Sequence, residues 1–328
     1  LIEDVESGED INTSLDKFER STEVTEAEEA SGTLGEIMSE IFNEVDGGKP
    51  IDKTLTGIPI VDECTNGLAK GELVTIGAKS GKGKSALAVR IAVNMFRDGK
   101  KVLIVSREMS KKQIGERILL AHSGVTKENY EKRTLSETDW VRIVETTEAF
   151  NTDQIIIDDK IATIPEIKQA VRKHKPDMLI VDYVQLLTPT NPRDSRERQV
   201  ADMSRELKKM TSDFDMIVVQ LTQLAEKGIG NYRPHGESYP RESRAIYHDS
   251  NLVIYVHHVE EEKEIQIAYN STAVKERMSL HQFEEMLKRF DDNDTRLMEI
   301  IVDKNRSGTV GSKFYWFSGP EMSYFPVL

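Results

Sequence analysis

The sequence has one cysteine and no long apolar run. Cys64 has no second thiol with which to form an internal disulfide, and its neighbours do not resemble a catalytic cysteine site. No apolar run approaches the ~18 residues of a membrane-spanning helix, and no signal peptide is visible. With 38% apolar and 31% charged residues, the composition favours a soluble globular protein without a membrane partner, in a reducing cytoplasmic setting.

Basic residues are scarce in the N-terminal segment. Residues 1–46 contain 15 Asp or Glu and only Lys17 and Arg20, which accounts for the whole net charge of −13. The remainder is neutral, so the net charge argues neither for nor against nucleic acid, because a neutral domain can still carry a basic lining. We expect residues 1–32 to be a disordered acidic leader or the remnant of an N-terminal domain.

A helix is expected immediately after this leader, over residues 33–48. Thr33 and Glu36 have the spacing of a capping box, and Gly47-Gly48 end the pattern. Apolar residues recur between them at helical spacing: Leu34, Ile37, Met38, Ile41, Phe42 and Val45. The apolar face either packs on its own domain or docks onto a neighbouring subunit.

The most informative stretch runs from Leu73 to Ala92. An apolar strand, Leu73–Ile76, leads into a loop with three glycines, and a helix pattern follows over Ser85–Met95. Glycine lets backbone N–H groups turn inward around phosphate oxygens, and the helix N-terminus adds its dipole. This order predicts a nucleotide-binding phosphate loop, the alternative being an ordinary glycine-rich turn. The expected binding residues are Ala78, Lys79, Ser80, Gly81, Lys82, Gly83, Lys84 and Ser85.

Two residues of this loop have expected chemical roles. Lys84 would reach the β- and γ-phosphates of ATP or another nucleoside triphosphate, and the Ser85 hydroxyl would hold Mg²⁺. Ala78 stands where the usual pattern begins with glycine, one residue after Gly77.

Helix patterns alternate with short apolar strands along the rest of the chain. Such alternation predicts an α/β fold with a mostly parallel sheet covered by helices on both faces. Four segments read as strands of an added antiparallel part: Leu252–Val256, Glu264–Ala268, Leu297–Val302 and Phe314–Phe317.

Three polar residues follow apolar strands and are expected at the nucleotide. Asp182, after the strand Met178–Val181, is the expected second magnesium residue and acts through water. Glu108 follows the strand after the phosphate loop and would orient or deprotonate the attacking water. Gln223 follows another strand and would sense the γ-phosphate. For Glu108 and Gln223, the alternative is a solvated position on the surface. The rivals of Asp182, on a strand that reads as less central, are Asp158 and Asp159.

Two polar loops, Ala225–Ser243 and Thr188–Gln199, are candidates for DNA binding. Long loops in compact domains are usually functional, and basic side chains on loops suit phosphodiester groups. Ordinary solvated loop charge is the alternative. The basic residues are Lys227, Arg233 and Arg241 in the first loop and Arg193, Arg196 and Arg198 in the second.

Lys304 and Arg306 form a further pair of cations near a strand end. Residues two apart on a strand point the same way, so both are expected to reach a γ-phosphate, their own or a neighbour's, as an arginine finger does. A charge pair at a hairpin turn is the alternative. His257 and His258 are adjacent on a strand and face opposite sides, so no zinc site is predicted there.

With these residues in view, the chain resembles the RecA-like motor domain of DnaB-type replicative helicases, a phosphate-loop NTPase fold. The likeness covers about residues 56–325, and Ala78 is similar to that family's loop as well. The stretches that carry it, in order, are Ser106–Ser110, Asp182–Leu187, Leu221–Leu224, Arg241–Ser243 and Lys304–Gly308.

The resemblance implies a homo-hexameric ring that moves 5′ to 3′ on single-stranded or forked DNA by hydrolysing ATP or another NTP with Mg²⁺. It implies a primase and a helicase loader as partners. It makes 33–48 a linker helix docked on the next subunit and 49–328 the motor domain. The implied roles are catalytic glutamate for Glu108, magnesium for Asp182, sensor for Gln223, DNA grip for Arg241 and Glu242, and action in trans for Lys304 and Arg306.

Three departures from the family pattern point to a divergent, phage-like member. Arg244 replaces a glycine usual in the DNA loop, residues 273–296 look like an insertion rich in helix formers, and the N-terminal collar is missing or truncated. The setting implied is the cytoplasm of a bacterial cell or of a phage-infected host. A recombinase-like filament ATPase and an ATP-switch loading factor are the alternatives.

Overall fold

The structure is a computed structural model that describes residues 32–48, 52–224, 233–235, 241–291, 295–319 and 323–327. The chain divides into two units, Leu1–Ile51 and Asp52–Leu328, and each is considered by itself. The predicted disordered leader lies outside the described residues except for Gly32. Among the described helices, none is both long enough and apolar enough to cross a membrane.

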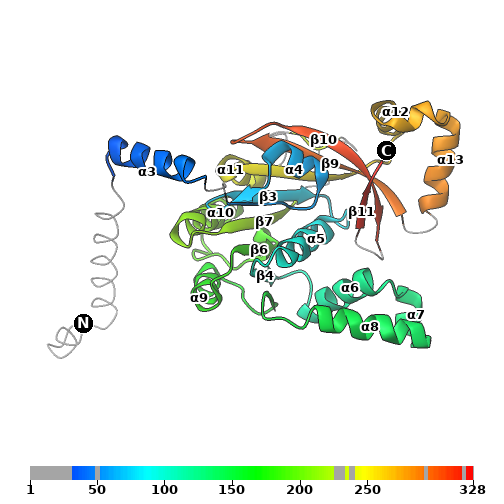
Figure 1. Ribbon diagram of the computed structural model, residues 1–328, viewed down its shortest axis with the longest axis horizontal. Helices are drawn as coiled ribbons and strands as arrows, with labels where there is room; N and C mark the ends of the chain where they lie inside the picture. The colour runs from blue at the N-terminus through cyan, green and yellow to red at the C-terminus, as the bar shows by residue number, and fades with distance from the viewer. Residues whose placement is uncertain are drawn as a thin grey trace. The chain divides into compact units, whose positions relative to one another are not determined.

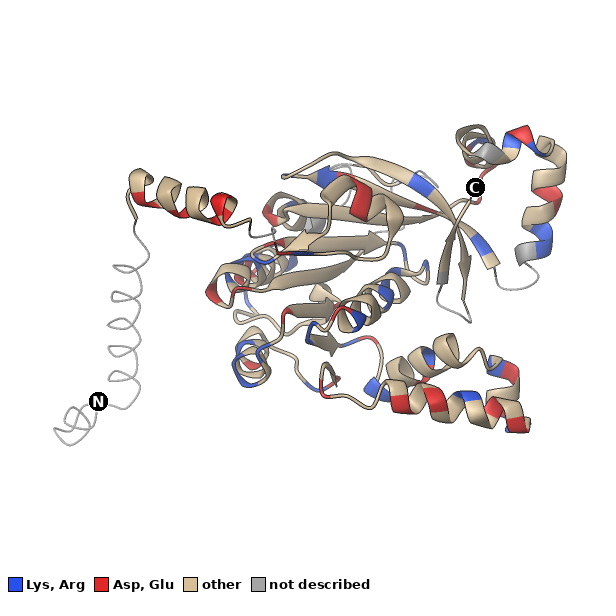
Figure 2. Cartoon of the chain, viewed as in Figure 1, with Lys and Arg blue, Asp and Glu red and all other residues tan. Residues whose placement is uncertain are grey.

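In the first unit, the predicted helix is confirmed as α3, Leu34–Asp46. The Thr33 side chain accepts a hydrogen bond from the Glu36 N–H at 3.3 Å, and Glu36 Oε2 accepts one from the Thr33 N–H at 2.7 Å. This capping box satisfies two otherwise unpaired donors of the first turn. None of the residues of α3 is buried, and its apolar residues are exposed by 44% at Ile37 to 75% at Leu34. In Figure 2 its ribbon is coloured for acidic residues and for no basic ones.

The second unit is built on a nine-stranded sheet in the order β11-β10-β9-β8-β3-β7-β6-β4-β5 (Figure 1). The strands from β8 to β5 are parallel, which confirms the predicted α/β fold, and β9, β10 and β11 add an antiparallel edge. The bounds are β3 Leu73–Ala78, β4 Val102–Ser106, β5 Ile155–Asp158, β6 Met178–Asp182, β7 Ile217–Gln223, β8 Leu252–His258, β9 Thr295–Asn305, β10 Gly311–Ser318 and β11 Ser323–Pro326. A separate pair is formed by β1 Lys53–Thr54 and β2 Leu68–Ala69.

Helices pack on both faces of the parallel strands. The alternation along β6 shows this, because Met178 and Ile180 pack with α5 while Leu179 and Val181 pack with α9 and α10. The helices of the second unit are α4 Pro59–Thr65, α5 Lys84–Arg97, α6 Lys111–Ser123, α7 Lys127–Lys132, α8 Glu137–Ala149, α9 Ile164–His174, η1 Val184–Leu186, α10 Arg196–Asp213, α11 Arg241–Asp249, α12 Glu262–Ser271, η2 Ala273–Glu276 and α13 Leu280–Asp291.

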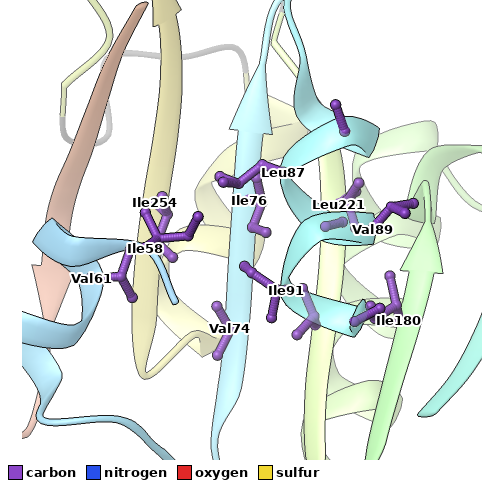
Figure 3. Packing of buried hydrophobic residues seen from close by; sticks show 14 of the residues in the cluster. Ile58, Val61, Val74, Ile76, Leu87, Val89, Ile91, Ile180, Leu221 and Ile254 are labelled. Carbon is purple, nitrogen blue, oxygen red and sulfur yellow. The ribbon is translucent and has the colours of Figure 1, made fainter. Parts of the chain in front are cut away.

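The packing of α5 against the sheet centre is shown in Figure 3. This contact buries the helix that follows the phosphate loop and so fixes where its N-terminus lies. At about 1.5–3 kcal/mol for each fully buried Leu or Ile, it is a large contribution to the stability of the site. The labelled contacts include Leu87, Val89 and Ile91 of α5 with Val74, Ile76, Ile180 and Leu221 of the strands.

Two of the four predicted antiparallel strands were wrong in pairing or type. Leu252–Val256 belongs to β8, which runs parallel to β3 and joins the antiparallel edge only through β9. Glu264–Ala268 lies in helix α12, because Ile265 and Ala268, three apart, share the face that packs around Phe283. The segments Leu297–Val302 and Phe314–Phe317 are confirmed as parts of the antiparallel β9 and β10.

The predicted insertion contributes to a small helical module beside the antiparallel edge. It consists of α12, η2 and α13, of which η2 and α13 lie within residues 273–296 and are helical as the composition of that segment indicated. Phe283 of α13 is fully buried between this module and the strands, 5.9 Å from the ring of Trp316 on β10. The module therefore has its own apolar contact with the sheet edge.

Candidate functional site

The predicted strand, glycine loop and helix are confirmed. The loop runs from the end of β3 at Ala78 to the start of α5 at Lys84. Gly81 and Gly83 have φ angles of 69° and 86°, in the left-handed region where a side chain is strained. A Cβ on Gly83 would also lie 2.9 Å from the hydroxyl of Tyr324. The loop thus needs glycine at Gly83 for both its backbone conformation and its space.

The polar residues predicted at strand ends all lie on one side of the sheet, at the carboxyl ends of its parallel strands. Because β3, β7, β6 and β4 are parallel neighbours, their carboxyl ends meet at the same edge. The register places Gln223 directly beside Ala78, and Asp182 beside Ser106. Glu108 follows two residues after Ser106. The sheet therefore gathers the phosphate loop, Gln223, Asp182 and Glu108 at the position where open α/β sheets bind ligands.

Lys84 is the centre of the charge cluster at this edge. Its Nζ lies 3.2 Å from Glu108 Oε2 and 3.3 Å from Asp182 Oδ1. It also lies 4.0 Å from the ring centroid of Tyr183, a cation–π contact. Lys84 is 7% exposed and Asp182 is 4% exposed, so each buried charge is compensated by the other. Burial and the Glu108 carboxylate raise the pKa of Tyr183, which therefore stays protonated at neutral pH.

Asp182 and Ser85 fit a magnesium ion. Both line one small cavity, whose other lining residues are mostly apolar. Oδ1 of Asp182 is buried and accepts no hydrogen bond in the described structure, although the Lys84 charge is near. Carboxylate and hydroxyl oxygens are ligands that Mg²⁺ prefers. The rival Asp158 is on the edge strand β5, and its Oδ1 accepts the N–H groups of Lys160 and Ile161 at 2.7 and 2.9 Å.

Gln223 is tied to the segment that follows Asp182. The side chain of Gln185 donates to Thr222 Oγ1 at 2.7 Å and to the Gln223 carbonyl at 3.4 Å. The Gln185 carbonyl in turn accepts a hydrogen bond from Arg196 at the start of α10. Neither Gln185 nor Tyr183 was among the predicted site residues, although both lie within the stretch Asp182–Leu187 that carried the family resemblance.

Residues from the C-terminal half hold the phosphate loop, and the sequence did not predict them. Lys82 Nζ lies 2.8 Å from His258 Nδ1 and 2.5 Å from Glu260 Oε1. The hydroxyl of Tyr324 on β11 donates to the Gly83 carbonyl at 3.1 Å. These contacts join residues that are 176 to 241 positions apart in the chain, so no local sequence pattern predicts them.

The predicted DNA loops are shorter than expected. Arg196 and Arg198 lie in α10, and Arg196 is held by Gln199 Oε1 at 3.1 Å and by the Gln185 carbonyl, so it has a structural contact. Arg193 remains on the loop and is exposed. Arg233 was predicted to face DNA but makes a two-pronged ion pair with Glu299, at 2.7 Å for each bond. This pair raises the pKa of Arg233 and leaves Glu299 only 5% exposed.

The remaining DNA candidates lie on or near α11. Arg241 and Glu242 begin this helix and so are not in a loop, contrary to the prediction. Arg244 is in the same helix and exposed, and α11 packs against α10. Lys227 lies outside the described residues.

Lys304 and Arg306 lie near the amino-terminal ends of the parallel strands, whereas the phosphate loop lies at their carboxyl ends. The antiparallel β9 pairs Lys304 with Val253, near the start of β8. Lys304 Nζ donates to the carbonyls of Tyr247 and His248 at 2.6 and 3.0 Å, and Arg306 donates to the His248 carbonyl at 2.7 Å. The two side chains do point the same way, onto the C-terminal end of α11. The expectation that they reach their own γ-phosphate is wrong, because the six residues of β3 separate the two ends of the strands by roughly 17–20 Å.

Comparison with known proteins decides the family. The DnaB-like helicase C-terminal domain family matches residues 54–325. The chain belongs to this family. It is 30% identical to the replicative DNA helicase DnaB of Leifsonia xyli subsp. xyli over 241 residues, 68% of this chain and 51% of that protein. It is 25% identical to DnaB of Geobacillus stearothermophilus over 320 residues, 93% of this chain and 64% of that protein.

A solved structure gives the same fold. A DnaB-like replicative helicase, described together with its interactions with primase, superimposes with a TM-score of 0.70 at 23% identity, over 93% of this chain and 70% of that one. The second unit thus has a RecA-like fold, and its phosphate loop implies nucleotide binding. The chain spans between half and two thirds of the length of the two curated relatives named above.

Proposed function

We propose that the chain is the motor of a ring-shaped replicative DNA helicase that couples hydrolysis of ATP, or another NTP, to 5′–3′ movement on single-stranded DNA. The observation that carries the proposal is the cluster in which Lys84 lies between Glu108 and Asp182 beside the phosphate loop. A motor needs a phosphate-binding cation, a metal-binding carboxylate and a residue that orients water at one place. Family membership supports DNA as the track.

In this proposal each residue of the cluster has one task. Lys84 binds the β- and γ-phosphates, and the half-exposed Glu108 orients or deprotonates the attacking water. Gln223, beside the start of the loop, responds to the γ-phosphate. Ser85 and Asp182 would hold Mg²⁺, which neutralises phosphate charge when it is bound. Loss of the γ-phosphate would then shift Gln223 and, through hydrogen bonds, Gln185 and Arg196, which connect the end of β7 to α10.

The active form in this proposal is a homo-hexamer of motor domains, residues 49–328, joined by the linker helix 33–48. The exposed apolar face of α3 supports docking on the next subunit. A second apolar surface, Trp140, Val141 and Val144 on α8, is 51–56% exposed and offers a partner for it. Lys304 and Arg306 would act on the neighbour's nucleotide, since they lie far from their own phosphate loop.

The track and the partners follow the same reasoning. Exposed Arg193 and Arg244, with Arg241, Glu242 and Lys227, would contact single-stranded or forked DNA. A primase and a helicase loader are the proposed protein partners, in the cytoplasm of a bacterial cell or of a phage-infected host.

Electron microscopy with forked DNA and a non-hydrolysable nucleotide tests this function. Closed six-membered rings around one strand are expected, together with hydrolysis that single-stranded DNA stimulates. A helical filament on DNA would favour a recombinase-like ATPase instead. Nucleotide binding without DNA-stimulated hydrolysis would favour a loading switch.

A further inference from the structure

Lys82 connects the phosphate loop to the C-terminal half of the ATPase domain. Its ammonium group lies 2.8 Å from His258 Nδ1 and 2.5 Å from Glu260 Oε1, and His258 Nδ1 lies 2.6 Å from the same Glu260 oxygen, so the three groups form one cluster. The side chains of Lys82 and His258 are 25% and 14% exposed, whereas Glu260 is 48% exposed. Burial, with the charge of Lys82, lowers the pKa of His258, so its ring is uncharged at neutral pH.

This contact holds a part of the phosphate loop that makes few hydrogen bonds within the loop itself. Lys82 directly precedes Gly83, whose left-handed backbone leads into α5. The Lys82 N–H makes only a long hydrogen bond to the Lys79 carbonyl, at 3.3 Å. The Gly83 carbonyl is held by Tyr324 in addition to its helical bond to Leu87. Anchors from outside the loop therefore determine its conformation.

His257 and His258 face opposite sides of β8, as the sequence predicted, and each serves a different element. His257 Nε2 lies 2.9 Å from Glu264 in the first turns of α12. His258 and Glu260, on the connection from β8 to α12, hold Lys82. The end of β8 thus ties the helical module of α12, η2 and α13 on one side and the phosphate loop on the other.

We propose that Glu260 and His258 are positioning residues that hold the phosphate loop through Lys82 and so set how long a nucleotide stays bound. This inference rests on the proposed nucleotide binding at Lys84. It assigns Lys82 a role different from that of Lys84, since Lys82 acts on the loop backbone and Lys84 acts on the phosphates. It also connects the helical module, which begins at Glu262 two residues after Glu260, to nucleotide release.

The test measures the dissociation rate of a fluorescent ATP analogue by stopped flow, with KM and kcat for hydrolysis. Lys82→Met and Glu260→Gln should each speed dissociation and raise KM, by about three- to tenfold and two- to fivefold respectively, with kcat changed less than about twofold. Glu262→Gln is the matched control, because it removes the same charge from an exposed position two residues away. The exchange Lys82→Glu with Glu260→Lys should restore most of the wild-type rate.

The sign of the Glu260→Gln effect decides between positioning and direct attraction. If Lys82 simply attracted phosphates, removing its counter-charge would slow dissociation, and that result overturns the proposal. Dissociation rates equal to those of wild type and Glu262→Gln in all variants overturn it as well. Thermal unfolding and circular dichroism show that the variants are folded. If the wild-type chain binds nucleotide no better than Lys84→Ala does, the proposed function itself is refuted.

Discussion

Oδ1 of the buried carboxylate of Asp182 lies 3.3 Å from Lys84 Nζ and accepts no hydrogen bond in the described structure. The ion pair stabilises two charges that would be costly to bury alone. It also leaves that oxygen with unused lone pairs, on a residue that lines one small cavity together with Ser85. We infer that the site is organised for a cation and phosphates before either arrives, so substitutions should separate binding from turnover.

Lys84→Ala and Glu108→Gln should have different consequences. The first removes the cation that meets the phosphates and should reduce nucleotide affinity by more than about tenfold. The second keeps the shape of the site but removes the group that orients water, so binding should persist while kcat falls by about 10²–10⁴. Equilibrium binding of a fluorescent nucleotide and a phosphate-release assay measure the two effects.

Asp182 and Asp158, which both end apolar strands, provide a matched pair of variants that tests the magnesium assignment. Asp182→Asn should abolish magnesium-dependent hydrolysis, whereas Asp158→Asn, at the end of the edge strand β5, should leave that activity intact. Near-normal turnover in Glu108→Gln, with nucleotide bound, would contradict the assignment of that residue.

Arg306→Ala should remove DNA-stimulated hydrolysis with little loss of nucleotide affinity, by about 10³–10⁵ in turnover if it acts as an arginine finger. The hydrogen bond to the His248 carbonyl means that Arg306 also supports the end of α11 in its own subunit. Mixing distinguishes the two roles. Rings that combine Arg306→Ala and Lys84→Ala subunits, each inactive alone, should regain partial activity, because an intact arginine then meets an intact phosphate loop.

A failure to regain activity would count against action in trans, provided that mixed rings are shown to form. Thermal unfolding of Arg306→Ala reports the structural role separately. A lost hydrogen bond from a charged group predicts a decrease in the free energy of unfolding of about 1–3 kcal/mol.

The apolar face of α3 should be needed for assembly. Replacing Ile37 and Ile41 with Asp puts two charges on that face and should dissociate the rings while leaving folded monomers. Replacing Ser39 and Asn43 with Asp adds the same charges with the same spacing on the other side of the helix, and should leave the rings intact. Light scattering gives the molar mass of each variant. Unchanged hexamers in the first variant would show that this face packs elsewhere.

The candidate site followed from the sequence where function depends on strand ends. Lys84, Glu108, Asp182 and Gln223 each lie just after an apolar strand, and parallel strands bring their ends together without further information. Arg233 and Lys82 behaved differently, because their partners Glu299 and Glu260 are 66 and 178 residues away in the chain. Only the tertiary structure shows that Arg233 forms an ion pair with Glu299 and that Lys82 is held by Glu260.

The fold errors have a related cause. Alternation of apolar and polar residues over Glu264–Ala268 fits a short strand, and it also fits a helix that buries only Ile265 and Ala268. Packing around Phe283 decides between them. The parallel direction of β8 likewise depends on α11, a helix that the sequence reading had assigned in part to a loop.

His122 should make the stability depend on pH. It lies in the last turn of α6, where burial and then the charges of Arg97 and Arg90 lower its pKa to about 4. Its Nδ1 is 3.2 Å from Arg97, and its ring lies 5.1 Å from that of Phe150. The unfolded chain, with a histidine pKa near ~6.5, binds the proton more readily than the folded one. The free energy of unfolding should therefore decrease as the pH falls from about 6.5 to 4, by about 1–2 kcal/mol after allowance for solvent screening.

Urea unfolding at a series of pH values measures this dependence. His122→Asn should show a shallower decrease than wild type over that range, whereas His281→Asn, a substitution of an exposed histidine, should not. Equal slopes for wild type and His122→Asn would contradict the assignment.

The most direct test of the motor is strand displacement from a forked duplex by the purified wild-type chain with ATP and Mg²⁺. We predict release of the labelled strand only when the fork has a 5′ single-stranded tail, with no release by Lys84→Ala and none from a fork that has only a 3′ tail. ATP hydrolysis stimulated by DNA but without displacement of any forked strand would contradict the central claim.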